Sequence, residues 1–531
     1  MPRQVPAEIL LHILSYLIPD GNDIPDHHYA RIQVQTLSRM SRASRELRRI
    51  AEPILYGQLP LGYHTLKVLE TLCSRPDLGE HVRSISYSSW DYNAENCATL
   101  ERLLYERISP LIRDKYRWPA LNQFLKHLLD GGIDLHWEDN GGVLPQTLLL
   151  TLILCLTPNI EILNVNVDAL DDKADALSRL FELCGRYVCG VMRRARKDGD
   201  STRSSPVAPL HKLRSLQLTS TTSHGEPDSC RKKNVYPLFL FPRLETLELC
   251  SFNWVDTSQL GLDEDGEEDE DEQESDGEDE DEQESDGEDE EDADDDRWPS
   301  RLVLTSAGSH PNLKSFALLS CLPSSFAGLR EMLRIFPNLH TLICHYVFTE
   351  CREAINLTMY GSVLREFGPH LRHFELEPAE GADDIVEKAD GGALGSLRAR
   401  LTSLEQLRCP ISALVGSDVA SDEDNGADLD LCSFLPPSLR WFWTSVTAIG
   451  DASVHYKALA WMLDEAGSAA ERNGQGRLPA LEWVMVGIHR DSKVPTFEPC
   501  GFDVLRVSKR HFLYRKRSAA PVRNPPGWRL F

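Results

Sequence analysis

The sequence lacks the short motifs by which several classes of enzyme are identified. It has no Gly-x-Ser-x-Gly elbow, no glycine-rich phosphate loop ending in Lys-Ser or Lys-Thr, no His-Glu-x-x-His and no dinucleotide-binding glycine fingerprint. His136 and Glu138 are close in sequence, but no third group accompanies them to build a catalytic site. We therefore expect a protein without catalytic residues of its own and without a cofactor.

Its cysteines lack any regular spacing. The 13 cysteines are odd in number and include no Cys-x-x-Cys, which argues against a disulfide framework and against a zinc ribbon. The nearest group of metal-ligand types is His340, Cys344, His345 and Cys351. The first three fall on or just after an expected strand, whose alternation sends them to different faces, so we expect no metal site.

Long apolar runs are missing as well. Residues 143–156 are rich in leucine but too few to cross a bilayer, and the apolar segment near the N-terminus is interrupted by Glu8 and His12 and has no basic leader. We expect neither a signal peptide nor a transmembrane helix, and hence a cytosolic or nuclear protein with no membrane partner.

Basic residues are absent from residues 263–296, which hold 26 of the 83 acidic residues and leave 57 against 56 basic ones elsewhere. The segment contains a tandem decapeptide, 268–277 and 278–287, and self-repulsion predicts that it is a disordered insert. Ser275 and Ser285 each precede an acid by three residues, as in acidophilic phosphorylation sites. The insert is interpreted either as an electrostatic lure for basic partners such as histones or as a solvated spacer.

Residues 5–17 form an apolar segment with helical spacing. Pro6 suits the first turn of a helix, and Ile9, Ile13 and Leu17 recur four residues apart. A helix this short needs packing partners, which the next periodic segment, 37–56, provides after a polar link. The two segments predict a small helical unit.

The motifs of these two segments resemble those of fungal F-box proteins. The first opens with Pro-x-Glu-Ile-Leu and closes with Ser-Tyr-Leu, and the second contains Leu-Ser-Arg-Met-Ser-Arg and then, at 51–56, Ala-Glu-Pro-Ile-Leu-Tyr. The chain departs from the family at Val5, where Leu is usual, and in its long link over 18–35. The resemblance implies a three-helix module that binds a Skp-type adaptor and, through it, a cullin-RING ubiquitin ligase. The implied adaptor-binding residues are Val5, Pro6, Ile9, Leu10, Ile13, Leu14 and Leu17.

A six-residue pattern with apolar residues at its first and fourth positions, and usually at its sixth, returns ten times. Its copies begin at Val82, Ile160, Leu213, Leu244, Leu313, Leu339, Leu371, Leu404, Leu439 and Leu481. A proline two places earlier marks a turn before several copies, and helical stretches lie between many of them. Short strands alternating with helices predict an irregular leucine-rich-repeat solenoid, which resembles the degenerate repeats behind fungal F-boxes.

The expected fold class is therefore α/β. It comprises a small N-terminal helical F-box, an irregular leucine-rich-repeat solenoid of parallel strands alternating with helices, and a disordered acidic insert. The expected boundaries are 1–58 for the F-box, 59–262 and 297–508 for the two parts of the solenoid, 263–296 for the insert and 509–531 for a basic tail. The tail is interpreted as a nuclear-import signal, a phosphate-binding strip or plain solvated surface.

In such a strand the residues on either side of the fourth position point away from the core. In the early copies they are small and polar, whereas the last two supply three tryptophans and a methionine, a composition typical of binding hot spots. The expected target-binding residues are His373, Arg408, Trp441, Trp443, Trp483 and Met485. The alternative is that residues 527–531 or a neighbouring loop cover this patch and make it core.

The function expected from the sequence is that of a non-catalytic F-box receptor in an SCF-type ubiquitin ligase. Its partners would be a Skp-type adaptor, the cullin-RING ligase core and an unidentified target protein, without nucleic acid. The alternative is a non-ligase scaffold or histone-type binder that recruits basic proteins through the acidic insert.

Overall fold

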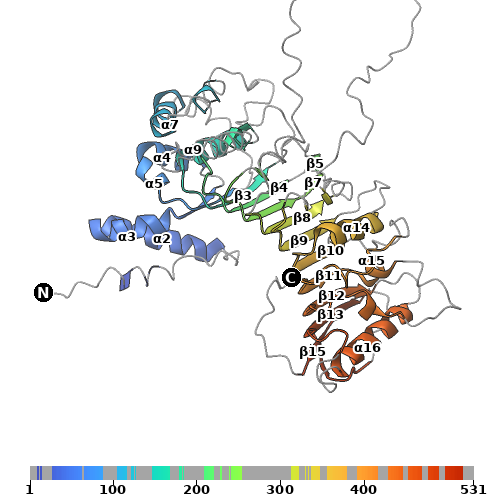
Figure 1. Ribbon diagram of the computed structural model, residues 1–531. Coiled ribbons are helices and arrows are strands. Elements are labelled where there is room, and N and C mark those ends of the chain that lie inside the picture. Colours follow the sequence, from blue (N-terminus) through green and yellow to red (C-terminus); the bar gives the residue numbers. More distant parts are fainter. Residues whose placement is uncertain are drawn as a thin grey trace, which may run out of the picture.

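The chain folds into an N-terminal helical head followed by an open sheet with helices against it (Figure 1). This computed structural model describes residues 9–10, 12, 14, 27–61, 65–87, 104–116, 121–124, 126, 146–167, 177, 179–181, 183–184, 209–220, 228–229, 238–239, 241–253, 312–321, 329–330, 333, 336–346, 356–378, 392–416, 429–446, 452–468, 476–488 and 497–517. The acidic segment 263–296, with Ser275 and Ser285, lies outside the described residues.

The head consists of α2 (His27–Ala43), α3 (Arg45–Leu55) and a helical segment that includes residues 9, 10, 12 and 14. Ser44 caps α3, because its side chain accepts a hydrogen bond from the Leu47 backbone N–H at 3.1 Å. The head has a core of its own, separate from that of the sheet, made of Leu14, Leu37, Ile50 and Ala51. The expectation of a polar link as far as residue 35 was wrong, since α2 already begins at His27.

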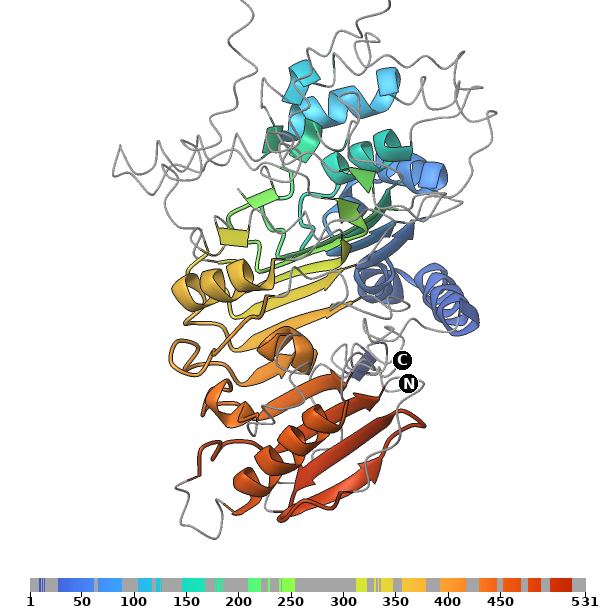
Figure 2. The same cartoon turned by 90° about the vertical axis from the view of Figure 1, so that its right-hand side faces the viewer.

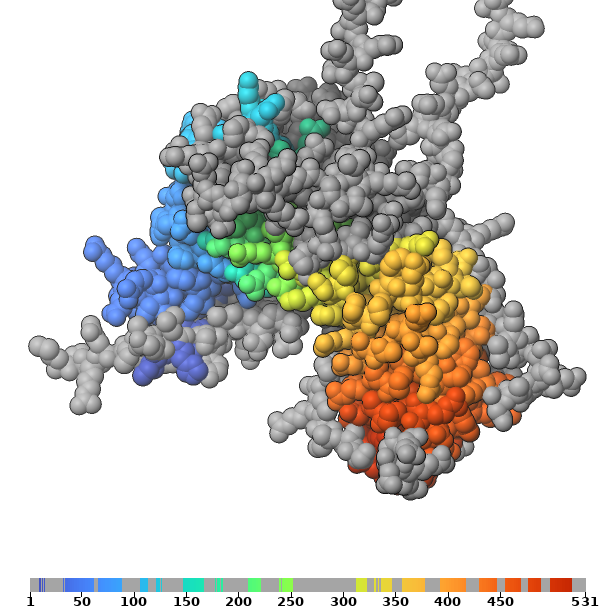
Figure 3. All heavy atoms as spheres, in the orientation of Figure 1, coloured from blue at the N-terminus to red at the C-terminus, as the bar shows by residue number. Residues whose placement is uncertain are grey.

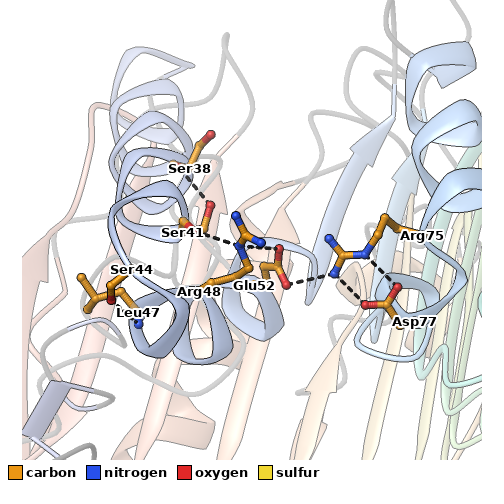
Figure 4. Close-up of polar contacts among 8 residues, drawn as sticks. All are labelled: Ser38, Ser41, Ser44, Leu47, Arg48, Glu52, Arg75 and Asp77. Carbon is orange, nitrogen blue, oxygen red and sulfur yellow. Dashed lines mark hydrogen bonds and ion pairs between the residues drawn. The ribbon is translucent and has the colours of Figure 1, made fainter.

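Alternating charges join the head to the rest of the chain (Figure 4). Glu52 of α3 lies between Arg48, one turn earlier, and Arg75, whose Nη2 approaches a Glu52 carboxylate oxygen at 3.2 Å. Arg75 also donates two hydrogen bonds to Asp77, at 2.6 and 2.9 Å. Tyr56 packs against the large core of the sheet. The head is therefore fixed to the following helices by polar and apolar contacts together.

The main sheet has thirteen strands, and those from β1 to β13 are all parallel. In sheet order they are β1 (Gln58–Leu61), β2 (Ser84–Tyr87), β3 (Ile162–Val167), β4 (Ser215–Ser220), β6 (Thr246–Cys250), β8 (Ser315–Cys321), β9 (Thr341–Tyr346), β10 (His373–Pro378), β11 (Gln406–Arg408), β12 (Trp441–Val446), β13 (Trp483–Ile488), β15 (His511–Lys516) and β14 (Phe502–Arg506). A separate parallel pair is formed by β5 (Asp228–Ser229) and β7 (Phe252–Asn253).

Each of the ten six-residue patterns forms a strand of this sheet, as the sequence predicts. Neighbouring copies pair directly even where long segments separate them, with Ile85 opposite Leu163 and Leu163 opposite Leu216. The described residues between β2 and β3 therefore contribute no strand to the main sheet. Most of them are helical, in η2 (Leu104–Ile108), in α7 (Ser109–Tyr116), at 121–124 and in α9 (Gln146–Leu156).

Helices pack against one face of the sheet (Figure 2). The fourth-position side chains share a core with residues of these helices, so they lie on this face. They are α4 (Thr65–Ser74), α5 (Pro76–Gly79), α9 (Gln146–Leu156), α14 (Leu357–Phe367), α15 (Ile411–Val415), the 3-10 turn η8 (Leu431–Ser433) and α16 (Ala452–Ser468). The fourth-position residues, such as Leu216, Phe316 and Phe442, are almost completely buried. Each such side chain contributes about 1.5–3 kcal/mol by leaving water, so this continuous row is the main apolar support of the sheet.

A C-terminal hairpin completes the sheet and corrects two expectations. β15 pairs antiparallel with β13 and with β14, and its Phe512, Leu513 and Tyr514 are buried. The boundary expected after residue 508 therefore falls inside the hairpin, and residues 511–516 are not a solvated basic tail. The physical reason is that β15 pairs with the edge of β13, which would otherwise be open, while its aromatic and aliphatic side chains pack into the adjoining apolar clusters. Residues 518–531 lie outside the described part of the chain.

In the main sheet, the residue just before each strand from β2 to β13 belongs to a row of mostly alternating charge. Backbone hydrogen bonds of 2.7–2.9 Å link successive members, which are Arg83, Glu161, Arg214, Glu245, Lys314, His340, Arg372, Glu405, Arg440 and Glu482. Three neighbouring pairs form ion pairs, for example Lys314 with Glu245 at 2.9 Å. His340 stands where an acid would continue the alternation, and burial, followed by the charges of Arg372 and Lys314, lowers its pKa.

Candidate functional site

The expected target-binding residues come together on the sheet face opposite the helices. Strand register aligns them in two rows: His373, Gln406, Trp441 and Trp483 in one, and Glu375, Arg408, Trp443 and Met485 in the other. All eight line one hollow of about 50 Å³, together with Leu407, Phe442 and Leu513. The six chosen residues are thus neighbours on one face of the sheet.

The prediction that the four apolar residues form an exposed patch is wrong for two of them. Trp483 and Met485 are only 4% and 5% exposed and form a small second core with Leu513 of β15. Leu513 lies directly opposite Met485, and the Trp441 ring stacks on Trp483 with centroids 5.3 Å apart. A neighbouring segment thus helps cover the patch, as the sequence alternative allowed, although residues 527–531 lie outside the described part of the chain. Trp441 and Trp443 remain half-buried walls of the hollow.

Arg408 organises the polar side of the hollow. Its guanidinium carbon lies 3.4 Å from the centroid of the Trp443 ring, the geometry of a cation–π contact. The same guanidinium forms an ion pair with Glu377 and approaches Glu375 at 3.7 Å. Its positive charge is therefore largely compensated inside the protein before any ligand is present.

Glu375 is held by two histidines from its own strand and the neighbouring one. Its carboxylate oxygens lie 3.0 Å from His345 Nε2 and 2.6 Å from His373 Nε2. Burial alone would raise the pKa of Glu375, but the hydrogen bonds with His345 and His373 and the Arg408 charge outweigh burial and hold the pKa below its ordinary 4.5. Glu375 therefore stays ionised at neutral pH.

Sequence reasoning missed three members of this polar cluster. Glu375 was expected to point outward but was not assigned to the site, and Glu377 and His345 lie one position beyond the six-residue pattern. The signal was available, because the two-residue alternation of a strand continues past the sixth position. His345 had been considered only as part of a weak metal grouping.

The structure separates the expected adaptor-binding residues into surface and core. Ile9 is half-exposed, Leu10 packs partly against the head core, and Leu14 is 1% exposed within that core. The expectation that Leu14 contributes to a binding surface is therefore wrong, because it holds the first helical segment against α2 and α3. Val5, Pro6, Ile13 and Leu17 lie outside the described residues.

Two further apolar side chains on the head surface were not anticipated. Ile32 and Val34 of α2 are about as exposed as Ile9. They were missed because residues 18–35 were interpreted as a link. The helical spacing of the segment that begins at residue 37 in fact extends back to residue 32.

A scan against protein-family models and a search of curated proteins gave no match to this chain. Within the described ranges, no helix is both long and apolar enough to cross a membrane, and no group of three or more potential ligands is arranged to hold a metal ion.

Proposed function

We propose that this protein is the substrate-recognition subunit of an SCF-type cullin-RING ubiquitin ligase. In this proposal the head is an F-box that binds a Skp-type adaptor. The sheet and its helices are a leucine-rich-repeat-type solenoid that binds a target protein. The observation that carries the proposal is a helical head with its own small core and an apolar surface, attached to a long repeated sheet that has a separate hollow.

The head surface supports the adaptor-binding part. Ile9, Ile32 and Val34 expose apolar side chains on a unit whose core is limited to a few residues. In this proposal the bound adaptor covers these side chains, which would then leave water. Ile9 belongs to the segment that carries the F-box-like motif, so it is the first residue that we assign to the adaptor contact.

The sheet supports the target-binding part. Trp441 and Trp443 are half-buried aromatic walls beside a cluster of charged groups, and the hollow they share is much smaller than the pockets of about 300–1,000 Å³ in which small-molecule ligands bind. A side chain of another protein fits this size. Aromatic and arginine residues in a partly desolvated setting are the usual anchors of protein interfaces.

The proposed mechanism is proximity. The adaptor would hold the head on the ligase core, and the target in the hollow would be kept near the ubiquitin-conjugating enzyme at a high effective concentration. The ion pair between Glu52 and Arg75 helps to hold the head in place. The head lies at one end of the molecule and the C-terminal strands at the other (Figure 3). In this mechanism the chain acts by binding alone and supplies no catalytic group.

The test is a binding measurement between the full-length protein and a Skp-type adaptor. Ile9→Asp should weaken the complex at least tenfold, because it places a charge in an apolar contact. Ile162→Asp is the matched control, since Ile162 is comparably exposed but lies on β3 of the sheet. It should bind the adaptor like the wild type.

Stoichiometric wild-type binding that Ile9→Asp loses and Ile162→Asp keeps would support the receptor assignment. A folded wild-type protein that does not bind the adaptor would overturn it. Leu14→Asp is unsuitable for this test, because Leu14 is in the head core and its replacement would disrupt the head itself.

A further inference from the structure

Two buried N–H donors that have no partner among the described residues belong to side chains that line the hollow. They are Nε1 of Trp483 and Nε of Arg408. Trp483 is 4% exposed, and the other nitrogens of Arg408 are engaged by Glu377 and Glu375. The two donors come from β13 and β11, on either side of the tryptophans of β12.

An unpaired buried donor is unfavourable, because the group gives up its hydrogen bonds to water on folding and gains none in return. Native proteins leave few such groups, and each requires an explanation. Here both donors belong to side chains that line the same small hollow. A ligand that brings a hydrogen-bond acceptor into the hollow would satisfy them.

The charges around the hollow decide what kind of acceptor fits. Arg408 is already compensated by Glu377, and Glu375 is ionised in the same wall. A phosphate or carboxylate would therefore meet the Glu375 charge without a free cation to balance it. A neutral acceptor avoids this repulsion and still accepts from both donors.

The walls of the hollow favour a flat ligand group that can also donate a hydrogen bond. The stacked rings of Trp441 and Trp483 and the ring of Trp443 border the hollow, whose volume is about 50 Å³. An amide group is flat, its carbonyl oxygen has two lone pairs, and its N–H can donate to the Glu375 carboxylate. It therefore matches the two free donors and the acceptor that the hollow presents.

We propose that the hollow binds an amide group of a target protein, with the amide oxygen accepting hydrogen bonds from Trp483 Nε1 and Arg408 Nε. The amide comes from an Asn or Gln side chain or from the peptide backbone. This inference rests on the proposed function only in taking the ligand to be a protein.

The experiment uses the full-length protein labelled with 5-fluorotryptophan and observed by ¹⁹F NMR. Trp483→Phe and Trp441→Phe assign two of the ten tryptophan resonances. The probes are blocked tripeptides, acetyl-Gly-Xaa-Gly-amide, in which Xaa is Gln, Asn, Glu, phosphoserine or Gly. The Gly peptide tests the backbone as the source of the amide, and the Gln and Asn peptides test the side chain.

The Gln or Asn peptide should shift the Trp483 resonance in a saturable way at millimolar concentration. Trp483→Phe keeps an aromatic ring but removes the N–H, and should weaken binding about fivefold as read from the Trp441 resonance. Trp461→Phe is the matched control, because Trp461 is an exposed tryptophan on α16 that does not line the hollow. It should leave binding unchanged.

Equal binding of the Gly and Gln peptides would identify the backbone as the source and support the amide assignment. Tighter binding of the Glu or phosphoserine peptide would overturn it, and so would a Trp483 resonance that no peptide shifts. The measurement needs no adaptor, so loss of the receptor assignment and loss of the amide site are separate outcomes.

Discussion

Arg408 contacts both the charged and the aromatic side chains of the hollow, and its removal should lower the free energy of unfolding. Arg408→Ala leaves the Glu377 carboxylate in a mostly buried setting without its partner, so we expect a loss of about 3–5 kcal/mol in the free energy of unfolding. Urea unfolding measures it. Arg440→Ala is the control, because Arg440 also pairs with a glutamate but is 48% exposed against 17% for Arg408. It should cost below about 1 kcal/mol. Equal losses in both variants would contradict the ion-pair network described here.

Glu375 should make the free energy of unfolding depend on pH in the acidic range. Its folded-state pKa is held below 4.5, so the ionised form stabilises the folded protein above that pH, and this stabilisation is lost as the pH falls through the folded value. Thermal unfolding of the wild type should therefore move to lower temperature on acidification below about pH 4.5. Glu375→Gln should be less stable than the wild type at neutral pH, and the difference should shrink in acid. A difference in stability between Glu375→Gln and the wild type that stays constant across this pH range would contradict the lowered pKa of Glu375.

At the scale of single residues, the sequence predicted which side chains lie on the open face but not how they are paired. The alternation of a strand places Arg408 and Trp443 on one face whatever the neighbouring strand is. The contact of Arg408 with Glu377 depends on the register between β10 and β11, whose patterns start 33 residues apart. Burial of Trp483 depended on β15, whose basic composition gave no sign of a buried strand.

At the scale of elements, α14 illustrates how closely a helix can approach the following chain. A Cβ added to Gly361 would overlap the backbone carbonyl of Leu394. Gly361→Ala should therefore push α14 away from residues 392–395 and lower the free energy of unfolding by about 1–3 kcal/mol, despite alanine's better helix propensity.

The control for this change is Gly487→Ala on β13. The nearest atoms to a Cβ there lie at 3.6–3.7 Å, which is ordinary van der Waals contact. We expect little change in its denaturant midpoint. A Gly361→Ala protein as stable as the wild type would mean that α14 is free to shift.

Strands with a strong repeated pattern were predicted well, and those outside it were not. The ten patterned strands appear where the sequence places them, because the spacing of buried apolar residues determines them. β1, β14 and β15 lack the pattern and were missed. They lie at the two ends of the sheet. There the edge of the last patterned strand is covered by a neighbouring segment that does not carry the six-residue pattern.

For the molecule as a whole, the acidic segment should be dispensable for folding. β6 and β8 pair directly, with Leu247 opposite Phe316, although residues 263–296 lie between them in sequence. Deleting 263–296 should leave the thermal midpoint within a few degrees of the wild type, because loop length changes the free energy only slowly. The deletion protein should also keep its adaptor. Loss of adaptor binding with folding intact would favour the alternative in which the acidic segment recruits the partner.

The row of charged residues that precede the strands limits how many strands such a sheet can gain or lose at a time. Along the row a base is followed by an acid, and His340 takes an acid's place between Lys314 and Arg372. Loss or duplication of a single repeat would put two like charges side by side, which disfavours the pairing. Loss or duplication of two neighbouring repeats restores the order. The natural step for shortening or lengthening this sheet is therefore a pair of repeats, one basic and one acidic.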